Sequence, residues 1–249
     1  MSEEGHFKFS ITVFVIPLAA MITIWSVYWV ELALGVNFND LGILPRTLMG
    51  LRGIALSPFI HGSLEHLYNN TIPLGILLSA LWYFYRDVAW KVVVYGILFS
   101  GMLTWLIGRS SFHIGASGLI YVLASFIFFK GIFSSYFRLI ALSLIVVFIY
   151  GSLLWYIFPV KDGISWEGHL AGFLTGLFLA IAVKAQIPKP KKYEWEEEGF
   201  KEEEDLFLKH FDEHGYFREL PPEEESPNEN QDVMVNYMYK KKRSKESDE

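Results

Sequence analysis

The amino-acid sequence predicts an all-α membrane protein built around a bundle of six transmembrane helices. Two observations support this class. Of the 249 residues, 52% are hydrophobic and 17% aromatic, and the mean hydropathy is +0.30. The charges are also segregated, because residues 187–249 hold nineteen of the 27 acidic residues and leave only eight for the rest of the chain.

Charged residues divide the first part of the chain into six uncharged segments, and we expect one helix in each. A helix needs about 20 apolar residues to cross a hydrocarbon layer of roughly 30 Å. The segments are enclosed by Lys8 and Glu31, Glu65 and Arg86, Lys91 and Arg109, Arg109 and Lys130, Arg138 and Lys161, and Glu167 and Lys184. The third and sixth are short, which fits a locally thin bilayer or a polar cavity above a helix end.

The first segment is too long for the apolar part of a signal peptide, and no small-residue cleavage site follows it, so we expect a transmembrane helix there. With the N-terminus cytoplasmic, nine Lys and Arg residues flank the inner ends of the segments and four flank the outer ends. Since cytoplasmic flanks are enriched in Lys and Arg, this asymmetry predicts that both termini are cytoplasmic.

The composition predicts three regions. Residues 1–10 form a short cytoplasmic N-terminus, residues 11–186 the six-helix domain, and residues 187–249 a charged cytoplasmic tail. Within the domain, the long connection between Glu31 and Glu65 is expected to be an interfacial structure rather than a free linker. In the tail we expect some helix around residues 193–211 and otherwise disorder.

Composition also excludes several classes of function. The acidic balance gives no reason to expect a nucleic-acid partner. The chain has no cysteine, so it can form no disulfide, thiolate metal site or cysteine nucleophile. We expect neither a metal nor another cofactor.

Polar residues inside the apolar segments are the candidates for function, because ionisable groups at membrane depth are costly. The second, fourth and sixth segments all run from outside to inside. Near their outer ends lie His66 with Asn70, Ser117 and His169, respectively. The predicted topology therefore gathers these four side chains in one outer layer.

Ser117 lies between Gly115 and Gly118, which allow close backbone approach. A serine at a helix start has free backbone N–H groups beside it and the positive end of the helix dipole, which suit a developing oxyanion. From this motif alone, a small-residue contact between helices remains an equal alternative.

His169 shares one helix face with Gly172 and Gly176, and this glycine stripe would let its helix approach a neighbour closely. A general base must come within about 3 Å of the hydroxyl that it deprotonates. The alternative is a buried histidine bonded to a backbone carbonyl. No acidic residue is suitably placed for a triad, because Glu167 is expected at the interface, so a Ser–His dyad is the simpler hypothesis.

The remaining candidates share faces with these residues. His66 and Asn70, four residues apart, can both donate hydrogen bonds to an oxyanion, or can serve as polar contacts between helices. Tyr121, four residues after Ser117, could pack against the imidazole of His169. We expect His113 to make a loop-anchoring hydrogen bond.

Together these motifs resemble the rhomboid family of intramembrane serine proteases over roughly residues 10–186. His66 with Asn70 is similar to a motif of the family's second helix, and residues 115–118 resemble its G-x-S-G nucleophile motif. His169, with the two glycines that follow it, resembles A-H-x-x-G-x-x-x-G, except that Gly168 replaces the usual alanine. The first loop of the family often carries a Trp-Arg pair, whereas residues 50–53 of this chain read Gly-Leu-Arg-Gly.

The resemblance implies a rhomboid-like fold with Ser117 as nucleophile and His169 as general base and acid. The oxyanion would be bound by His66, Asn70 and the backbone N–H of Ser117. Tyr121 would pack on the catalytic histidine, and His61 would support the region.

The expected function is therefore that of a serine endopeptidase cleaving transmembrane protein substrates near the outer face of a bacterial inner membrane. Its partners are those substrates and the lipid bilayer. Two alternatives remain open at this point. One is a catalytically inactive relative that binds membrane proteins. The other is an ion or metal transporter that uses His61, His66, His113 and His169.

Overall fold

The computed structural model describes residue 7 and residues 9–160, 163–187, 193–196, 198–203, 205 and 207–219. The chain divides into two compact units, one up to Lys191 and one from Lys192 onwards. Among the described residues the regular elements are all helical, apart from two isolated β-bridges. The all-α prediction is thus confirmed.

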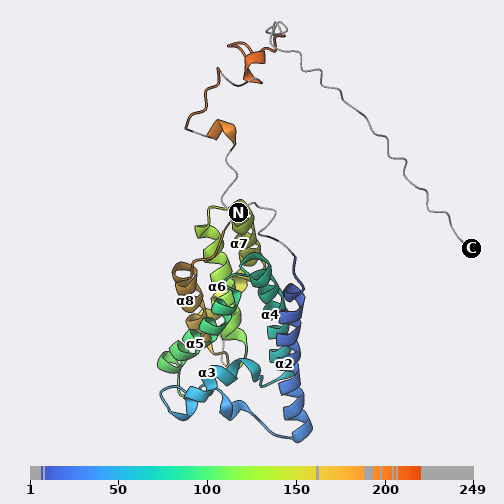
Figure 1. The fold of residues 1–249 in the computed structure, drawn as a ribbon. Helices are drawn as coiled ribbons and strands as arrows, with labels where there is room; N and C mark the ends of the chain where they lie inside the picture. Colours follow the sequence, from blue (N-terminus) through green and yellow to red (C-terminus); the bar gives the residue numbers. More distant parts are fainter. Residues whose placement is uncertain are drawn as a thin grey trace, which may run out of the picture. The chain divides into compact units, whose positions relative to one another are not determined.

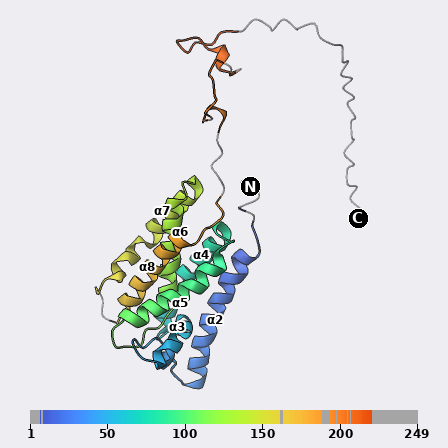
Figure 2. The same ribbon diagram turned by 60° about the vertical axis from the view of Figure 1, so that its left-hand side comes forward.

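The first unit is a bundle of six long helices (Figures 1 and 2). They are α2 (Thr12–Leu34), α4 (Leu64–Phe84), α5 (Ala89–Ile107), α6 (Ser117–Phe133), α7 (Phe137–Tyr150) and α8 (Trp166–Ala182). Each helix coincides largely with one of the six uncharged segments of the sequence. In length and composition α2 and α5 are sufficient to cross a bilayer, whereas α6, α7 and α8 are shorter apolar helices.

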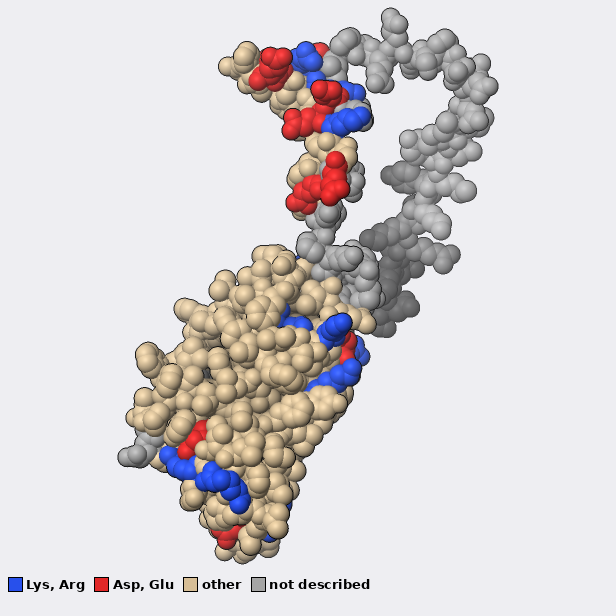
Figure 3. Space-filling view, turned by 90° about the vertical axis from the view of Figure 1, so that its left-hand side faces the viewer, with Lys and Arg blue, Asp and Glu red and all other residues tan. Residues whose placement is uncertain are grey.

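Charged side chains gather toward the two ends of this bundle on the face shown in Figure 3, and an uncharged band lies between them. Large apolar side chains are exposed on several helices, including Phe148 at 91% and Trp29 at 64%. A surface of this kind suits contact with lipid hydrocarbon, where an unpaired charge is costly.

The core of the bundle is α6, which is apolar on all sides and packs against α4, α5, α7 and α8. A helix with no polar face is expected in the interior. Its closest partner is α8. A methyl group at Gly172 would overlap the carbonyl oxygen of Gly118, and the Ser125 hydroxyl donates to the carbonyl oxygen of Phe173 at 2.7 Å. The glycines of α8 therefore bring its backbone against α6.

The connection between α2 and α4 is folded rather than extended. It contains η1 (Asn39–Leu41), η2 (Met49–Arg52), α3 (Gly53–Leu56) and η3 (Ser57–Phe59). The Leu48 side chain is 88% exposed and that of Met49 60% exposed, which is consistent with the expected interfacial structure. Ile43 and His113 exchange both backbone hydrogen bonds, at 2.9 and 3.0 Å, so this connection is attached to the loop before α6.

One helix differs from its predicted segment. The uncharged stretch after Arg138 continues to Val160, but α7 ends at Tyr150, and the chain continues as the 3₁₀ helix η4 (Gly151–Ile157). Carbonyl groups near the end of a helix have no partner within the element. One of them, on Tyr156, accepts a hydrogen bond from α8, as described below.

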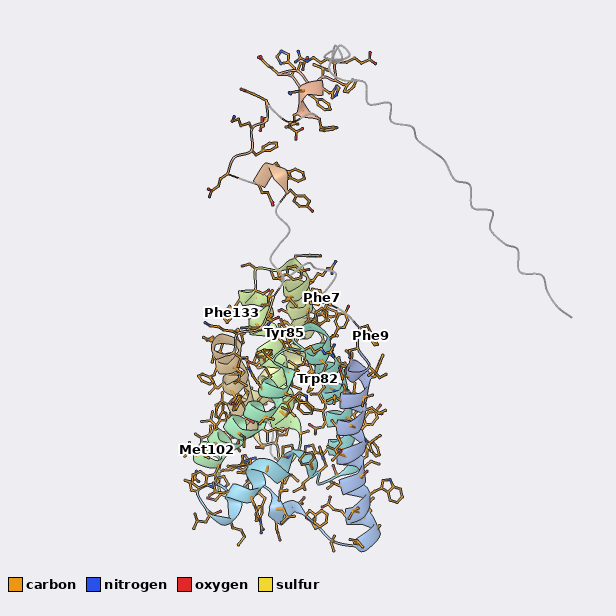
Figure 4. All side chains as sticks on the ribbon, in the orientation of Figure 1. Phe7, Phe9, Trp82, Tyr85, Met102 and Phe133 are labelled. Carbon is orange, nitrogen blue, oxygen red and sulfur yellow. The ribbon has the colours of Figure 1, made fainter. Side chains whose placement is uncertain are left out.

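The opposite end of the bundle from α3 is rich in aromatic side chains (Figure 4). The Phe7 ring lies 6.2 Å from that of Tyr83, 5.7 Å from Phe84 and 5.8 Å from Tyr136. The chain before α2 is thereby packed on the end of α4 and the start of α7.

Among the described residues of the second unit, the helical elements are the short η5 (Glu194–Glu196) and η6 (Leu208–His210), and Phe211 pairs with Phe217. The helix expected around residues 193–211 is therefore limited to these turns. The acidic run at 223–225 and the basic run at 240–243 lie outside the described residues, as do Lys161, Lys189 and Lys191.

Candidate active site

Ser117 is the first residue of α6, directly after a tight turn. Gly115 in this turn has φ +103°, a conformation that residues with a side chain rarely adopt. A methyl group there would lie 2.6 Å from Nε2 of His66, so the glycine also lets the His66 ring approach the turn. The turn is fixed by the Gly115 N–H, which donates to the carbonyl oxygen of Ser57 at 2.8 Å.

His169 lies in the first turn of α8 and is 8% exposed. Its Nδ1 is 3.0 Å from the carbonyl oxygen of Tyr156. A carbonyl oxygen can only accept, so Nδ1 carries the hydrogen and neutral His169 keeps a lone pair on Nε2. This is the tautomer that a general base needs at Nε2.

The imidazole of His169 stacks on the ring of Tyr121, with centroids 4.3 Å apart and 13° between the planes. Tyr121 is one helical turn after Ser117, so the structure brings His169 to the first turn of α6. No hydrogen bond joins the Ser117 hydroxyl to His169 among the described contacts. Catalytic hydrogen bonds are often loose in the free enzyme and tighten with substrate.

His61, His66 and Asn70 surround the same turn. The backbone N–H of Ala116 donates to Nε2 of His61 at 3.4 Å, and the rings of His61 and His66 are 5.0 Å apart. Burial lowers the pKa of His61 to about 4, with the neighbouring His66 adding to the effect, so its Nε2 stays available as an acceptor. The Asn70 side-chain amide donates one hydrogen to the carbonyl oxygen of His66 at 2.7 Å and has a second to give.

A cavity opens beside the serine. Its volume is about 40 Å³ for the centre of a water molecule, more than the roughly 10–15 Å³ that one water requires. Ser117, Gly115 and Gly118 line it, whereas His66, Asn70 and His169 do not. The polar residues that also line it are Ser57, Ser100, Thr104, His113 and Ser165.

Several contacts around the site were not expected from the sequence. His113 makes two hydrogen bonds rather than one, to Ser165 and to the carbonyl oxygen of Arg109. Glu167 was expected at the interface, but it is 2% exposed and pairs with Arg109 at 3.7 Å. This partner lies 58 residues earlier in the chain and offsets the charge of the buried carboxylate. Of these contacts, only the role of Ser165 at the start of α8 had a signal in the sequence, because serine is a common N-cap residue and Ser165 directly precedes an apolar helix.

No group of three or more His, Asp or Glu residues that could hold a metal ion occurs in the part of the chain that the structure describes.

The fold and the site together define a helical membrane protein with a serine at one helix start and a histidine in the first turn of its neighbour. A rhomboid domain model matches residues 50–186, which include every candidate residue named above. The chain therefore belongs to the rhomboid family, which confirms the resemblance, and it is an integral membrane protein.

Its relatives include mycobacterial proteins. The chain is 37% identical over 161 residues to Uncharacterized protein Rv1337 of Mycobacterium tuberculosis and to Uncharacterized protein Mb1372 of Mycobacterium bovis, covering 60% of this chain and 66% of theirs. It is 38% identical over 152 residues to Uncharacterized protein ML1171 of Mycobacterium leprae, covering 57% of this chain and 59% of the relative. The match thus spans just under two thirds of these relatives at most.

Proposed function

We propose that this chain is an intramembrane serine endopeptidase that cleaves transmembrane proteins with a Ser117–His169 dyad. The observation that carries the proposal is the bond from His169 Nδ1 to the carbonyl oxygen of Tyr156 at 3.0 Å. It leaves the Nε2 lone pair free on a ring that is held against the first turn of α6. Rhomboid family membership supports the same reaction class.

In the proposed reaction, His169 Nε2 accepts the proton of the Ser117 hydroxyl while Oγ attacks the scissile carbonyl carbon. His169 then gives this proton to the leaving amine as the C–N bond breaks, which leaves an acyl-enzyme. Water attacks the ester, His169 takes its proton, and the acid product leaves with Ser117 reprotonated. The cavity beside Ser117 has room for a water molecule next to the acylated side chain, from where it must approach His169.

The tetrahedral intermediate needs hydrogen-bond donors for its oxyanion. The backbone N–H of Ser117 lies at the start of α6, where no preceding helical carbonyl accepts it. Asn70 has a second amide hydrogen, and His66 lies against the Gly115 turn. These three groups are the proposed oxyanion hole.

The proposal includes a topology. The six long helices span a bacterial inner membrane, both termini are cytoplasmic, and α4, α6 and α8 begin on the outer side. Substrate helices enter sideways from the lipid and unwind locally to expose a carbonyl, so helix-destabilising residues such as glycine favour cleavage.

The test uses purified protein in liposomes, a fluorophosphonate probe, and a single-span substrate with glycines near its outer end. We expect wild-type protein to be labelled and to cleave, Ser117→Ala to do neither, and His169→Ala to lose at least about 10³-fold in rate. Ser111→Ala is the matched control, because Ser111 is an exposed serine of the same loop. Labelling of Ser117→Ala at the wild-type level would exclude Ser117 as the nucleophile.

One observation favours a second candidate, a non-catalytic membrane-protein binding module: the described contacts include no hydrogen bond between Ser117 and His169. The same experiment separates the two functions. A binding module leaves wild-type protein unlabelled and the substrate uncleaved but bound.

A further inference from the structure

Three residue pairs attach the loop before α6 to the start of α8. Nδ1 of His113 is 2.5 Å from the hydroxyl oxygen of Ser165. Arg109 donates its backbone N–H to the Glu167 carboxylate at 3.2 Å and pairs with the same oxygen through its side chain at 3.7 Å. The Arg109 guanidinium also donates to the carbonyl oxygen of Ile164. We call these four side chains and their bonds the loop clamp.

The hydrogen positions in the clamp follow from its partners. Nε2 of His113 is 3.1 Å from the carbonyl oxygen of Arg109, which can only accept, so Nε2 carries the hydrogen. Nδ1 then accepts the hydroxyl hydrogen of Ser165. The same Ser165 oxygen accepts the backbone N–H of Gly168 at 3.3 Å and caps α8. Ser165 thus caps one helix while it binds the loop that leads to the other.

His113 and Ser165 have the same spacing in sequence from the two members of the proposed dyad. His113 is four residues before Ser117, and Ser165 is four residues before His169. His113 is 4% exposed and Glu167 2% exposed, so one member of each pair is buried, where a hydrogen bond is stronger than in water. The backbone of His113 is held as well, through its paired bonds with Ile43.

We propose that His113 and Ser165, supported by Arg109 and Glu167, are positioning residues that hold the serine turn and His169 in reactive alignment. The proposal rests on the proposed function. The described hydrogen bonds of these four side chains run to one another and to backbone groups, and none runs to the side chain of Ser117 or His169. The four side chains therefore act by fixing the loop and the start of α8 against each other. A displacement of about 1 Å at a reacting group can cost about 10²-fold in rate.

The experiment compares Ser165→Ala, Ser165→Thr and His113→Phe with wild-type protein in the liposome assay. Ser165→Ala and His113→Phe are expected to lower kcat by about 10- to 100-fold with KM changed less than about threefold. Threonine keeps a hydroxyl and an N-cap, so Ser165→Thr should restore kcat to within about threefold of wild type. Since the two partners share one bond, the double variant should lose little more than either single variant.

The stability control is Lys130→Met, which removes hydrogen bonds at the other end of the α6–α8 pair. It should lower the unfolding temperature without lowering kcat. If Lys130→Met reduces kcat as much as Ser165→Ala does, or if Ser165→Ala keeps wild-type kcat, the positioning role is wrong.

A second measurement keeps the clamp testable when wild-type protein shows no cleavage, which would refute the proposed function alone. Hydrogen–deuterium exchange is followed in the loop at 108–116 and in the first turn of α8. His113→Phe should speed exchange in both segments by at least about tenfold, and Lys130→Met in neither. Unchanged exchange in His113→Phe would overturn the clamp irrespective of activity.

Discussion

The imidazole of His169 lies almost parallel to the ring of Tyr121, with the ring centroids 4.3 Å apart. The two residues belong to α8 and α6, and Tyr121 follows Ser117 by one helical turn. Offset stacking contributes about 0.5–1.5 kcal/mol beyond area burial. Together with the bond to Tyr156, the contact restricts both the position and the rotation of the proposed base.

A comparison of Tyr121→Phe with Tyr121→Leu tests whether the aromatic ring of Tyr121 positions His169. Phenylalanine keeps the stacking surface, so we expect its kcat to stay within about fivefold of wild type. Leucine fills much of the volume but has no flat ring, and about a 10- to 100-fold loss is expected from the freed imidazole. The measurement is single-turnover cleavage in liposomes. Equal rates for the two variants would show that stacking does not position His169.

The glycine contact between α6 and α8 gives a second prediction, with its control on the facing helix. A methyl group at Gly172 would overlap the carbonyl oxygen of Gly118 and lie 2.8 Å from Cβ of Tyr121. Gly172→Ala must therefore separate the helices, and we expect a loss of about 1–3 kcal/mol in stability together with most of the fluorophosphonate labelling.

Gly118→Ala provides the contrast, because the nearest atom to its methyl group would be the carbonyl oxygen of Gly168 at an ordinary 3.7 Å. Removing a helical glycine should leave the unfolding temperature equal or higher. Thermal unfolding in detergent measures both variants. A Gly118→Ala protein as unstable as Gly172→Ala would contradict the packing described for this contact.

Charge spacing predicted most of the fold, because hydrocarbon excludes charge and helix length follows from what lies between charges. The early end of α7 could not be predicted in this way, since residues 151–157 carry no charge. Their 3₁₀ geometry places the Tyr156 carbonyl oxygen beside His169. A backbone acceptor of this kind has no signature in the sequence.

The candidate site, like the fold, could be predicted only in part from the sequence. Ser117, His66 and His169 could be selected because polar side chains are rare in apolar helices. The burial of Glu167 could not be predicted, since a carboxylate next to a helix end is expected to be exposed unless its partner is known. Its partner Arg109 belongs to the loop between α5 and α6, and the packing of these helices with α8 brings the two residues together.

Stability should decrease in acid because of His61. Burial lowers its pKa to about 4 from the ordinary 6.5, so the unfolded chain binds a proton that the folded protein refuses. The folded state therefore loses stability as pH falls from about 6.5 toward 4, by about 3 kcal/mol over the full interval, and is unaffected by this group above about pH 7.5. Protonation would also remove the acceptor for the Ala116 N–H.

The measurement is the unfolding temperature in detergent between pH 4 and pH 8. His61→Gln does not titrate in this range, and its side-chain oxygen can accept from Ala116, so we expect a flatter profile. Burial also lowers the pKa of His113, and some slope should therefore remain. An identical profile in wild type and His61→Gln would exclude His61 as the acid-sensitive group.

The last prediction concerns the other end of α6, where Lys130 caps α8. Its ammonium donates to the carbonyl oxygens of Ala180 at 2.9 Å and Val183 at 2.6 Å. Carbonyl groups at a helix C-terminus have no intrahelical partner and carry the negative end of the dipole, so a cation is favourable there. Hydrogen bonds to charged groups contribute about 1.5–3 kcal/mol.

Lys130→Met keeps an unbranched apolar stem and removes the donors, and we expect it to lower the free energy of unfolding by about 2 kcal/mol. Lys130→Arg retains donors and charge and should lose less than half of that. Because the cap lies at the far end of α6 from Ser117, kcat should stay within about twofold of wild type in both variants below their unfolding temperatures. Urea or thermal unfolding in detergent, with cleavage measured on the same samples, decides this prediction. A loss of kcat in Lys130→Met while the protein is fully folded would contradict the prediction that this cap affects stability alone.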